Sequence, residues 1–474
     1  MRRSLLVLTA RWVPAYDAKT TERERCMPFA IDRRRLIANL TGSVLTLSIC
    51  SGARASKGAE PRIDAGRLQG TLEELSTFGR PAGGSFADGV SRVAYSDADI
   101  AGRAYVMGLM RDAGLAPAID PAGNIIGRRA GLDGAARPIL MGSHIDSVPS
   151  GGNFDGDVGS MAAIEVVRTL NDHQVRTRHP LEVTLWSNEE GGPFGSAAVV
   201  EPVTQETLAL PFNGVTMRDG LRRIGGDPDR IAQAVRPAGS LHCYLELHIE
   251  QGGILANSAI PIGVVDGIVS IDEYVVEVHG FANHAGTTPM GERRDALLAA
   301  SKLVEAVREI TTRAPGRQVG TVGRFQVFPN APNVIPGLVK LSIEFRDLSA
   351  DTVARLGAEI TTRAREIAGQ TDTEISLQRI AHDPPALADP LIQEQIEAAA
   401  ATLNLKTMHL PSGAGHDAQF LAKLGPMGMI FVPSIGGISH SPKELSRWSD
   451  CANGADVLLR TVLRVDRARL QAAP

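Results

Sequence analysis

The chain is poor in cysteine and aromatic residues, and its body lacks a strongly basic stretch. Among 474 residues there are 4 cysteines, and 4% are aromatic. No CxxC pair or disulfide framework is present, so Cys243 and Cys451 are expected to be packing residues. A net charge of −4 gives no electrostatic support to nucleic-acid binding, and the shortage of aromatics argues against stacking platforms for bases.

Several catalytic motifs are missing as well. The sequence contains no HExxH zincin helix, no GxSxG nucleophile elbow, no Walker P-loop and no GxGxxG after a predicted strand. No apolar segment is long enough to span a bilayer permanently. The chemistry must therefore be sought in residues that are distant in sequence.

The N-terminal segment has the layout of a secretory leader. After Met27 come the arginines Arg33 and Arg34, an apolar stretch over 36–49 and a small-x-small cleavage site at 53–55. The paired arginines resemble a twin-arginine export signal, which predicts a periplasmic or exported protein. A buried helix, with a cytoplasmic location, is the alternative. We interpret 1–26 as a gene-model extension and 27–55 as the signal peptide.

Two patterns of hydrophobicity divide the remaining chain. In 60–269 and 386–474, helical patterns alternate with near-continuous apolar runs, namely PILMGS (138–143), LEVTLWS (181–187), CYLELH (243–248) and GMIFVPS (428–434). Such runs predict an α/β fold whose mostly parallel sheet is covered by helices. Residues 270–385 instead show half-exposed alternating strands and two amphipathic helices in the order β-α-β-β-α-β. We therefore predict a ferredoxin-like α+β insert that forms a lid on a two-part catalytic domain.

Imidazole and carboxylate groups stand at the ends of these four runs. Open α/β sheets place their sites at the carboxyl ends of the strands. The residues at these ends are His144, Glu189, Glu190, His248 and His440. Asp155 lies in the glycine-rich turn SGGNFDGDVGS, just before a predicted helix. These side chains are therefore expected to gather at one edge of the sheet.

The set of side chains predicts a metal centre. Nitrogen and oxygen ligands without thiolate favour zinc, manganese or cobalt. Three histidines and two acids are too many for one tetrahedral ion, but they suit two divalent ions about 3.5–4 Å apart that share a carboxylate. We predict that Asp155 is the shared ligand. Asp146, two residues after His144, is a candidate partner that orients one of the histidine ligands without binding the metal itself.

The ordered motifs resemble a known family. They are SHIDSVPSGGNFDGD, NEEGGPFG, HIEQGGIL, GFANHAGTTPM, PNVIPG, EFRD, SGAGHDA and VPSIGGISHSPKE. This set resembles the M20 metallo-amidohydrolases, and within them the hydantoinase/carbamoylase branch. The resemblance implies a dinuclear-zinc exopeptidase-like fold, two divalent ions and a homodimer formed through the lid.

The resemblance also implies an activity: hydrolysis of a linear amide or ureido C–N bond other than a peptide bond, in a small substrate that bears a carboxylate. An N-carbamoyl-L-amino acid is the expected substrate. The alternatives are allantoate or ureidoglycolate, then the substrates of an M20 peptidase or aminoacylase, and last an inactive binding protein.

Matched position by position, the resemblance implies roles for individual residues. The metal ligands are His144, Asp155, Glu190, His248 and His440. Glu189 matches the general base that activates a water held by the two metals, and His284 matches a lid histidine that reaches a neighbouring subunit's site. Asn333 and Arg346 match groups that hold the substrate carboxylate. Gln251 matches a contact to the ureido end.

Three further positions bear on the substrate. His248 separates this branch from related aminoacylases and peptidases, which carry an acid at that ligand. Gly192-Pro193-Phe194 departs from the branch, which usually has an arginine before the phenylalanine, so the substrate stays open. His416 is compatible with a substrate contact or with a structural role in a glycine-rich loop.

Overall fold

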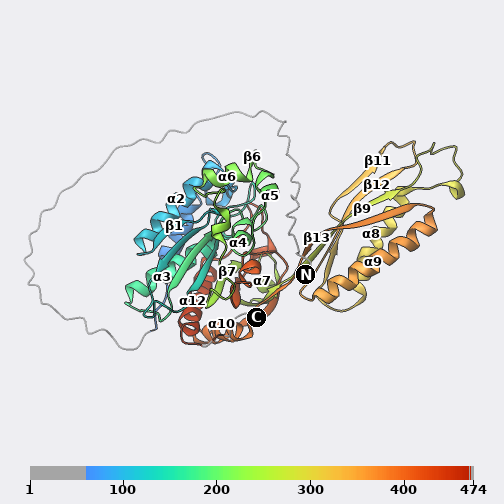
Figure 1. Ribbon diagram of the computed structural model, residues 1–474. Helices are drawn as coiled ribbons and strands as arrows, with labels where there is room; N and C mark the ends of the chain where they lie inside the picture. Colours follow the sequence, from blue (N-terminus) through green and yellow to red (C-terminus); the bar gives the residue numbers. More distant parts are fainter. Residues whose placement is uncertain (1–59, 469, 471–474) are drawn as a thin grey trace, which may run out of the picture. The chain divides into compact units, whose positions relative to one another are not determined.

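A computed structural model describes residues 60–468 and 470 (Figure 1). The predicted extension over 1–26 and the predicted signal peptide over 27–55 lie outside these residues. Within the described part of the chain, no helix combines the length and the apolar character needed to cross a membrane.

The larger sheet has nine strands and carries the predicted site. Its strands are β1 (Ala116–Ile119), β2 (Ile125–Arg129), β4 (Leu181–Trp186), β3 (Ile139–His144), β7 (Cys243–Ile249), β16 (Met427–Val432), β8 (Ile262–Ile268) and β14 (Ala386–Leu387), with β15 (Thr407–Ser412) beside β8. The central neighbours β4, β3, β7 and β16 are parallel, whereas β1, β2, β8 and β14 join by antiparallel pairs. The predicted α/β class is confirmed, and the four apolar runs form the parallel centre.

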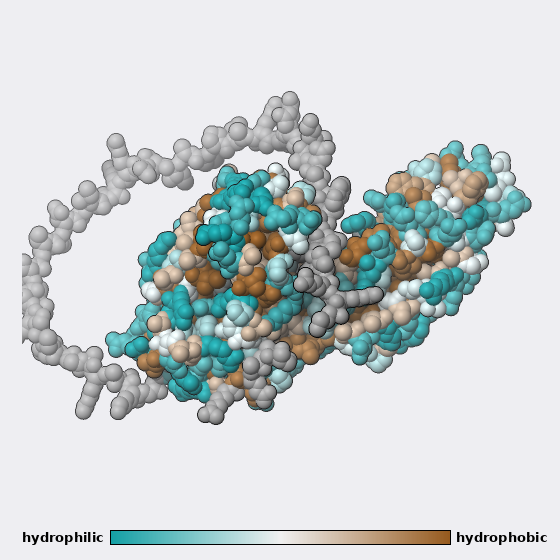
Figure 2. All heavy atoms as spheres, viewed as in Figure 1, coloured by the Kyte–Doolittle hydropathy of each residue, from teal (hydrophilic) through white to brown (hydrophobic). Residues whose placement is uncertain are grey.

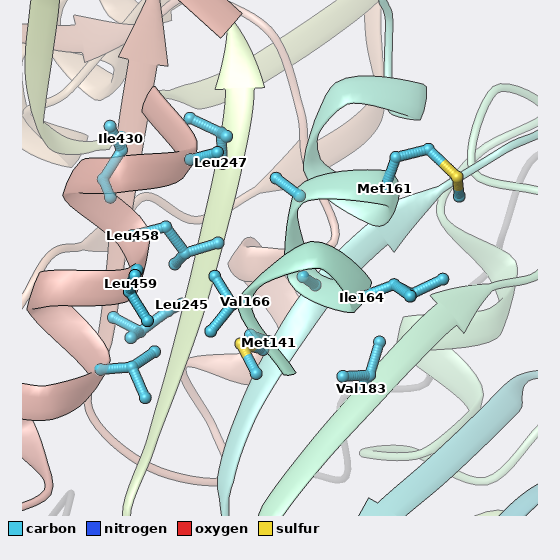
Figure 3. Close-up of a cluster of buried hydrophobic side chains, with 14 of the residues drawn as sticks. Met141, Met161, Ile164, Val166, Val183, Leu245, Leu247, Ile430, Leu458 and Leu459 are labelled. Carbon is cyan, nitrogen blue, oxygen red and sulfur yellow. The ribbon is translucent and has the colours of Figure 1, made fainter. Parts of the chain in front are cut away.

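The four central strands are apolar along their whole length because helices or loops cover both of their faces. Every residue of β3, β4, β7 and β16 is buried. One face packs against α1 (Ala65–Leu75), α3 (Asp157–Asp172), α10 (Pro390–Thr402) and α12 (Trp448–Val465), and α2 (Asp97–Asp112) lies beside β1 and β2. Figure 3 shows side chains of α3 and α12 meeting those of the sheet, among them Met161, Val166, Leu458, Met141 and Leu245.

The opposite face of the large sheet has a second core. Leu140, Trp186 and Tyr244 point into it from β3, β4 and β7. Short helices cover it: α4 (Phe194–Ala198), α5 (Gln205–Ala209), α6 (Met217–Arg223), α7 (Ile254–Ser258) and α11 (Ala418–Leu421), with the small hairpin of β5 (Pro211–Phe212) and β6 (Val215–Thr216) nearby. The strand ends between these two cores are therefore fixed on both sides.

The insert forms a separate five-stranded antiparallel sheet. Its elements are β9 (Ser270–His279), α8 (Ala296–Arg313), β10 (Val319–Thr321), β11 (Phe325–Phe328), β12 (Leu338–Asp347), α9 (Ala350–Thr371) and β13 (Glu374–Asp383). The strand order β10-β12-β9-β13 matches the predicted ferredoxin-like arrangement. Strands β10 and β11 pair with successive parts of β12, so one predicted edge strand is broken into two.

The insert has its own hydrophobic core beneath α8 and α9. Inward residues of β9 and β12 alternate with more exposed ones, and a separate cluster joins them to the two helices. Some apolar side chains on the edge strands stay exposed, including Val319 (50%) and Phe328 (43%). Figure 2 shows hydrophobic residues among hydrophilic ones on the surface of the insert.

Candidate metal centre and active site

All five candidate ligands lie together at the carboxyl ends of the central strands. Asp155 Oδ1 is 3.2 Å from His248 Nε2 and 4.0 Å from His144 Nε2. Asp155 Oδ2 is 3.2 Å from His440 Nε2, which is in turn 3.3 Å from Glu190 Oε2. Residues from 144 to 440 thus converge because parallel strands end at one edge of the sheet.

Asp155 belongs to two different groups of ligands. One group combines it with His144 and His248, and the other with Glu190 and His440; in each group the ligand atoms lie within 4.8 Å of one another. Its two oxygens face different groups, since Oδ1 approaches His248 and Oδ2 approaches His440. This arrangement has the form expected for a carboxylate shared by two cations.

The hydrogen bonds of the histidines leave lone pairs directed at the centre. His144 Nδ1 donates to the carbonyl oxygen of Asp146, and His248 Nδ1 donates to that of Ile249, each at 3.0 Å. In the neutral form of each ring the proton is therefore on Nδ1, and Nε2 carries the free lone pair. His248 Nε2 and Asp155 Oδ1 are buried without a hydrogen-bond partner although they face each other. Two lone pairs in contact repel, and a divalent cation between them would bind both, so the residues present fit a metal ion.

Asp146 contacts His144 through its backbone and the turn after β4 through its carboxylate. Its carboxylate is 3.9 Å from His144 Nδ1, and the ring is held by its backbone carbonyl instead. The carboxylate accepts hydrogen bonds from the backbone N–H groups of Glu189 (3.2 Å) and Glu190 (3.1 Å). Asp146 therefore fixes the turn that carries both glutamates.

Glu189 and Glu190 occupy different positions in the centre. Glu190 belongs to a ligand group, whereas Glu189 lies outside both groups, with Oε2 3.8 Å from His144 Nε2. Burial, followed by the charges of Asp417 and Glu190, raises the pKa of Glu189 well above its ordinary value. Burial, followed by the charge of Asp155, raises the pKa of Glu190 to about 9. A cluster of buried carboxylates of this kind requires positive charge.

Part of that positive charge comes from His440. Its hydrogen bond with Asp155 is the largest cause that raises the His440 pKa, to about 9. Burial acts to raise the pKa of Asp155, but the hydrogen bond from His440 and the charges of His248 and His144 outweigh it and lower that pKa. The metal-free chain thus carries a proton on His440 in the group where a cation is expected.

Gln251 lies inside the centre. Its Nε2 donates to Asp155 Oδ2 at 2.8 Å and is 3.5 Å from His440 Nε2, while its Oε1 is buried without a partner. Its backbone has a positive φ of 59°, which is strained for a residue other than glycine. The side chain is thus held beside the shared carboxylate.

The other predicted substrate residues are on the insert. His284 is exposed, and its Nδ1 accepts hydrogen bonds from the N–H groups of Gly286 (3.0 Å) and Thr287 (3.2 Å), so the ring proton is on Nε2. Asn333 is exposed beside it, and its carbonyl accepts from Ala285 N.

Arg346 contacts the large-sheet side of the chain. It donates to Glu344 at 2.6 Å and to the Gly413 carbonyl at 2.7 Å, in the SGAGHDA loop. Among the hydrogen bonds and ion pairs of residues 60–468, none joins Arg346, His284 or Asn333 to the five candidate ligands.

The sequence motifs did not indicate Glu246, which supports the centre together with His416. Glu246 accepts hydrogen bonds from Ser143 Oγ, Tyr244 OH and Ala418 N, so its oxygens are engaged, although it is close to His248 and His416. His416 is buried, bonds to Ser412 and packs edge-on against the His248 ring, with centroids 4.4 Å apart. Glu246 and His416 therefore support the position of the His248 ring. The sequence did carry one sign of Glu246's role, since it is a charged residue inside an otherwise apolar strand.

The buried ion pair of Arg92 and Asp157 also supports the turn that carries Asp155. Arg92 is 1% exposed, pairs with Asp157 at 2.5 Å and donates to the carbonyls of Ile145, Leu75 and Phe78. Gly156 has φ of +65°, and a Cβ there would lie 2.4 Å from the His144 ring. The turn therefore requires glycine at this position.

Comparisons with known proteins identify the family and agree with the fold. Residues 140–464 match the family model described as peptidase family M20/M25/M40. The chain is 39% identical over 406 residues to an N-carbamoyl-L-amino acid amidohydrolase of Geobacillus stearothermophilus, covering 84% of this chain and 98% of that protein. It is 36% identical over 417 residues to a ureidoglycolate hydrolase of Arabidopsis thaliana, covering 85% and 87%.

A solved structure is also similar throughout. An amidase of the hydantoinase/carbamoylase family from Burkholderia multivorans superimposes with a TM-score of 0.79 at 37% identity, covering 86% of this chain and 99% of that chain. The chain therefore belongs to the M20/M25/M40 peptidase family. The relatives named here are an amidohydrolase, a ureidoglycolate hydrolase and an amidase.

Proposed function

We propose that the protein is a metal-dependent amidohydrolase that cleaves a linear C–N bond of an N-carbamoyl-L-amino acid. The observation that carries the proposal is the position of Asp155 between two ligand groups, with Glu189 beside them and outside both. His144, Asp155, Glu190, His248 and His440 would hold two divalent ions, with zinc, manganese and cobalt as candidates. When bound, such ions acidify water and polarise the scissile carbonyl.

Glu189 performs the proton transfers in this proposal. Its carboxylate is buried near His144, and its backbone N–H donates to the Asp146 carboxylate. It takes a proton from the attacking water and returns it to the leaving nitrogen. Burial raises the pKa of Glu189 above its ordinary value, which makes its carboxylate a stronger base than an exposed one.

The substrate is held by residues of the insert and by Gln251. Arg346 offers paired donors to a carboxylate, a geometry that lysine lacks. Asn333 supports the same group, and the Gln251 amide faces the ureido end. His284 carries its proton on Nε2 and donates to the developing oxyanion. His284 comes from a second copy of the chain, so the proposal includes a homodimer formed through the insert.

The second candidate substrate class is the ureides, namely allantoate and ureidoglycolate. The similarity to the Arabidopsis protein supports it, and Gly192-Pro193, where the branch usually carries an arginine, leaves the substrate open. A peptidase or aminoacylase is disfavoured by the imidazole at 248, and an inactive binding protein by the complete ligand set. Export through the twin-arginine-like leader is proposed on the sequence alone, with a cytoplasmic location as the alternative.

A substrate panel tests the proposal. Metal-free protein is reconstituted with zinc, manganese or cobalt and supplied in parallel with N-carbamoyl-L-amino acids, allantoate, ureidoglycolate and a dipeptide. We expect metal-dependent turnover that is greatest with the N-carbamoyl-L-amino acids. Greatest turnover of a ureide would select the second candidate, and the absence of metal-dependent turnover with every compound would refute the amidohydrolase.

A further inference from the structure

The buried carboxylate of Glu444 joins the two loops that carry Asp155 and His440. Its Oε1 accepts hydrogen bonds from the backbone N–H groups of Phe154 and Asp155, each at 3.0 Å. Its Oε2 accepts from the Ser439 hydroxyl at 2.8 Å. The same hydroxyl is 3.2 Å from Asp155 Oδ2. One side chain, 5% exposed, therefore connects the turn before α3 to the loop after β16.

The fit between Glu444 and the glycine-rich turn is close. A Cβ on Gly152 would lie 2.1 Å from Glu444 Oε1, so the carboxylate packs directly on the glycine backbone. A Cβ on Gly89 would lie 2.9 Å from Pro442 Cα, in the same loop as Glu444. A side chain that fills its space and has donors for both oxygens cannot shift without breaking hydrogen bonds.

The two ligand groups depend on this connection to different degrees. His144 ends β3 and His248 lies within β7, and each ring is held by a nearby backbone carbonyl. His440 instead lies in a loop, is half exposed and has a positive φ of 54°. Its position relative to Asp155 therefore rests on the connection through Ser439 and Glu444.

We propose that Glu444 is a positioning residue that sets the affinity of the group formed by Asp155, Glu190 and His440 for its metal ion. It acts by holding Asp155 Oδ2 and His440 Nε2 at the distance that one cation can span. The inference rests on the proposed two-ion centre and adds a residue outside the ligand set to it.

Zinc titration of the chelator-treated full chain tests the proposal. Calorimetry gives the affinity of each ion, and elemental analysis gives the zinc per chain. In Glu444→Ala we expect the second ion to bind about 10–100-fold more weakly, with the first ion within about threefold of wild type. Glu444→Gln should retain both ions, because its amide oxygen accepts from the two N–H groups and its NH2 donates to Ser439. The exposed neighbour gives a control, Lys443→Ala, which should match wild type.

The possible results separate the proposal from its alternatives. Two ions bound by Glu444→Ala with wild-type affinities, or equal weakening of both ions, would overturn the role of Glu444. If circular dichroism shows that Glu444→Ala is unfolded, Ser439→Ala replaces it, since this variant breaks the link and keeps both backbone contacts; an unchanged second ion there would also overturn the role. Fewer than two ions in the wild type would contradict the two-ion centre itself, independently of any variant.

Discussion

Asp155 Oδ1 and His248 Nε2 face each other at 3.2 Å in the interior of the protein, and neither atom has a hydrogen-bond partner. Burying a polar atom without a hydrogen-bond partner costs about 1–3 kcal/mol. A cation between them turns both into ligands and removes this cost. Metal binding should therefore stabilise the folded chain as well as activate it.

The shared position of Asp155 leads to a first prediction. Asp155→Asn removes the charge from both ligand groups, so both ions should be lost together and activity should fall below detection. Zinc per chain and turnover, measured on the same preparation, check this. Asp133→Asn, at a half-exposed position outside the ligand groups, is a control that should keep both. Retention of one tightly bound ion in Asp155→Asn would show that the carboxylate is not shared.

The backbone at Gly156 leads to a second prediction. Gly156→Ala meets both a positive φ and the His144 ring, whereas Gly83→Ala meets a positive φ of 75° in open space. Both variants should lose about 1–2 kcal/mol of unfolding free energy from the backbone alone. Only Gly156→Ala should also weaken zinc binding. Denaturant unfolding and zinc titration separate the two effects, and equal zinc affinity in both variants would contradict the account of the Asp155 turn.

A third prediction concerns the two subunits. If His284 serves the site of its partner, Glu189→Gln and His284→Asn should each be nearly inactive as pure dimers. After subunit exchange in an equal mixture, half of the dimers are mixed, and each holds one intact site out of two. Activity should then recover to about a quarter of wild type. No recovery, despite exchange shown by a mass-tagged subunit, would place His284 in its own subunit's site or outside catalysis.

The metal-free protein should be less stable at alkaline pH. In the folded chain the pKa of Glu190 is about 9, mainly from burial, and the pKa of His440 is about 9, mainly from its bond to Asp155. Their ordinary values are 4.5 and 6.5. Between pH 7 and 9 the folded state thus holds more protons than the unfolded state, so unfolding free energy falls as pH rises.

Thermal unfolding measures this dependence. We expect the Tm of the chelated protein to fall from pH 7 to pH 9, and the increase in Tm on adding zinc to grow over the same range, because zinc binds the deprotonated ligands. Glu190→Gln should reduce the slope. A Tm of the chelated protein that stays level or rises over this range would contradict the assigned pKa shifts.

Sequence patterns predicted the strands and helices whose formation depends on residues close together in the chain. The apolar runs became β3, β4, β7 and β16 because strands covered on both faces need apolar residues throughout. The convergence of His144 and His248 followed because parallel strands end at one edge. The break between β10 and β11 was not visible, since the run RQVGTVGRFQVF alternates as one strand would.

The supporting contacts depend on partners that are far away in sequence. Glu444 bonds to backbone groups 289 and 290 residues away, and Arg92 reaches Asp157 across 65 residues. Asp146 uses its carboxylate on two backbone N–H groups, which carry no sequence signal of their own. Side chains that hold a backbone in place are identified only when the tertiary structure brings them to it.

The division of labour between the neighbours Glu189 and Glu190 is the central claim, and one paired measurement tests it most directly. Bound zinc per chain and turnover of an N-carbamoyl-L-amino acid are determined for Glu189→Gln and Glu190→Gln under the same conditions. We predict that Glu189→Gln keeps two ions per chain and loses turnover by a factor of at least about 10², whereas Glu190→Gln binds the second ion weakly. Equal zinc content together with equal residual turnover in the two variants would contradict the assignment.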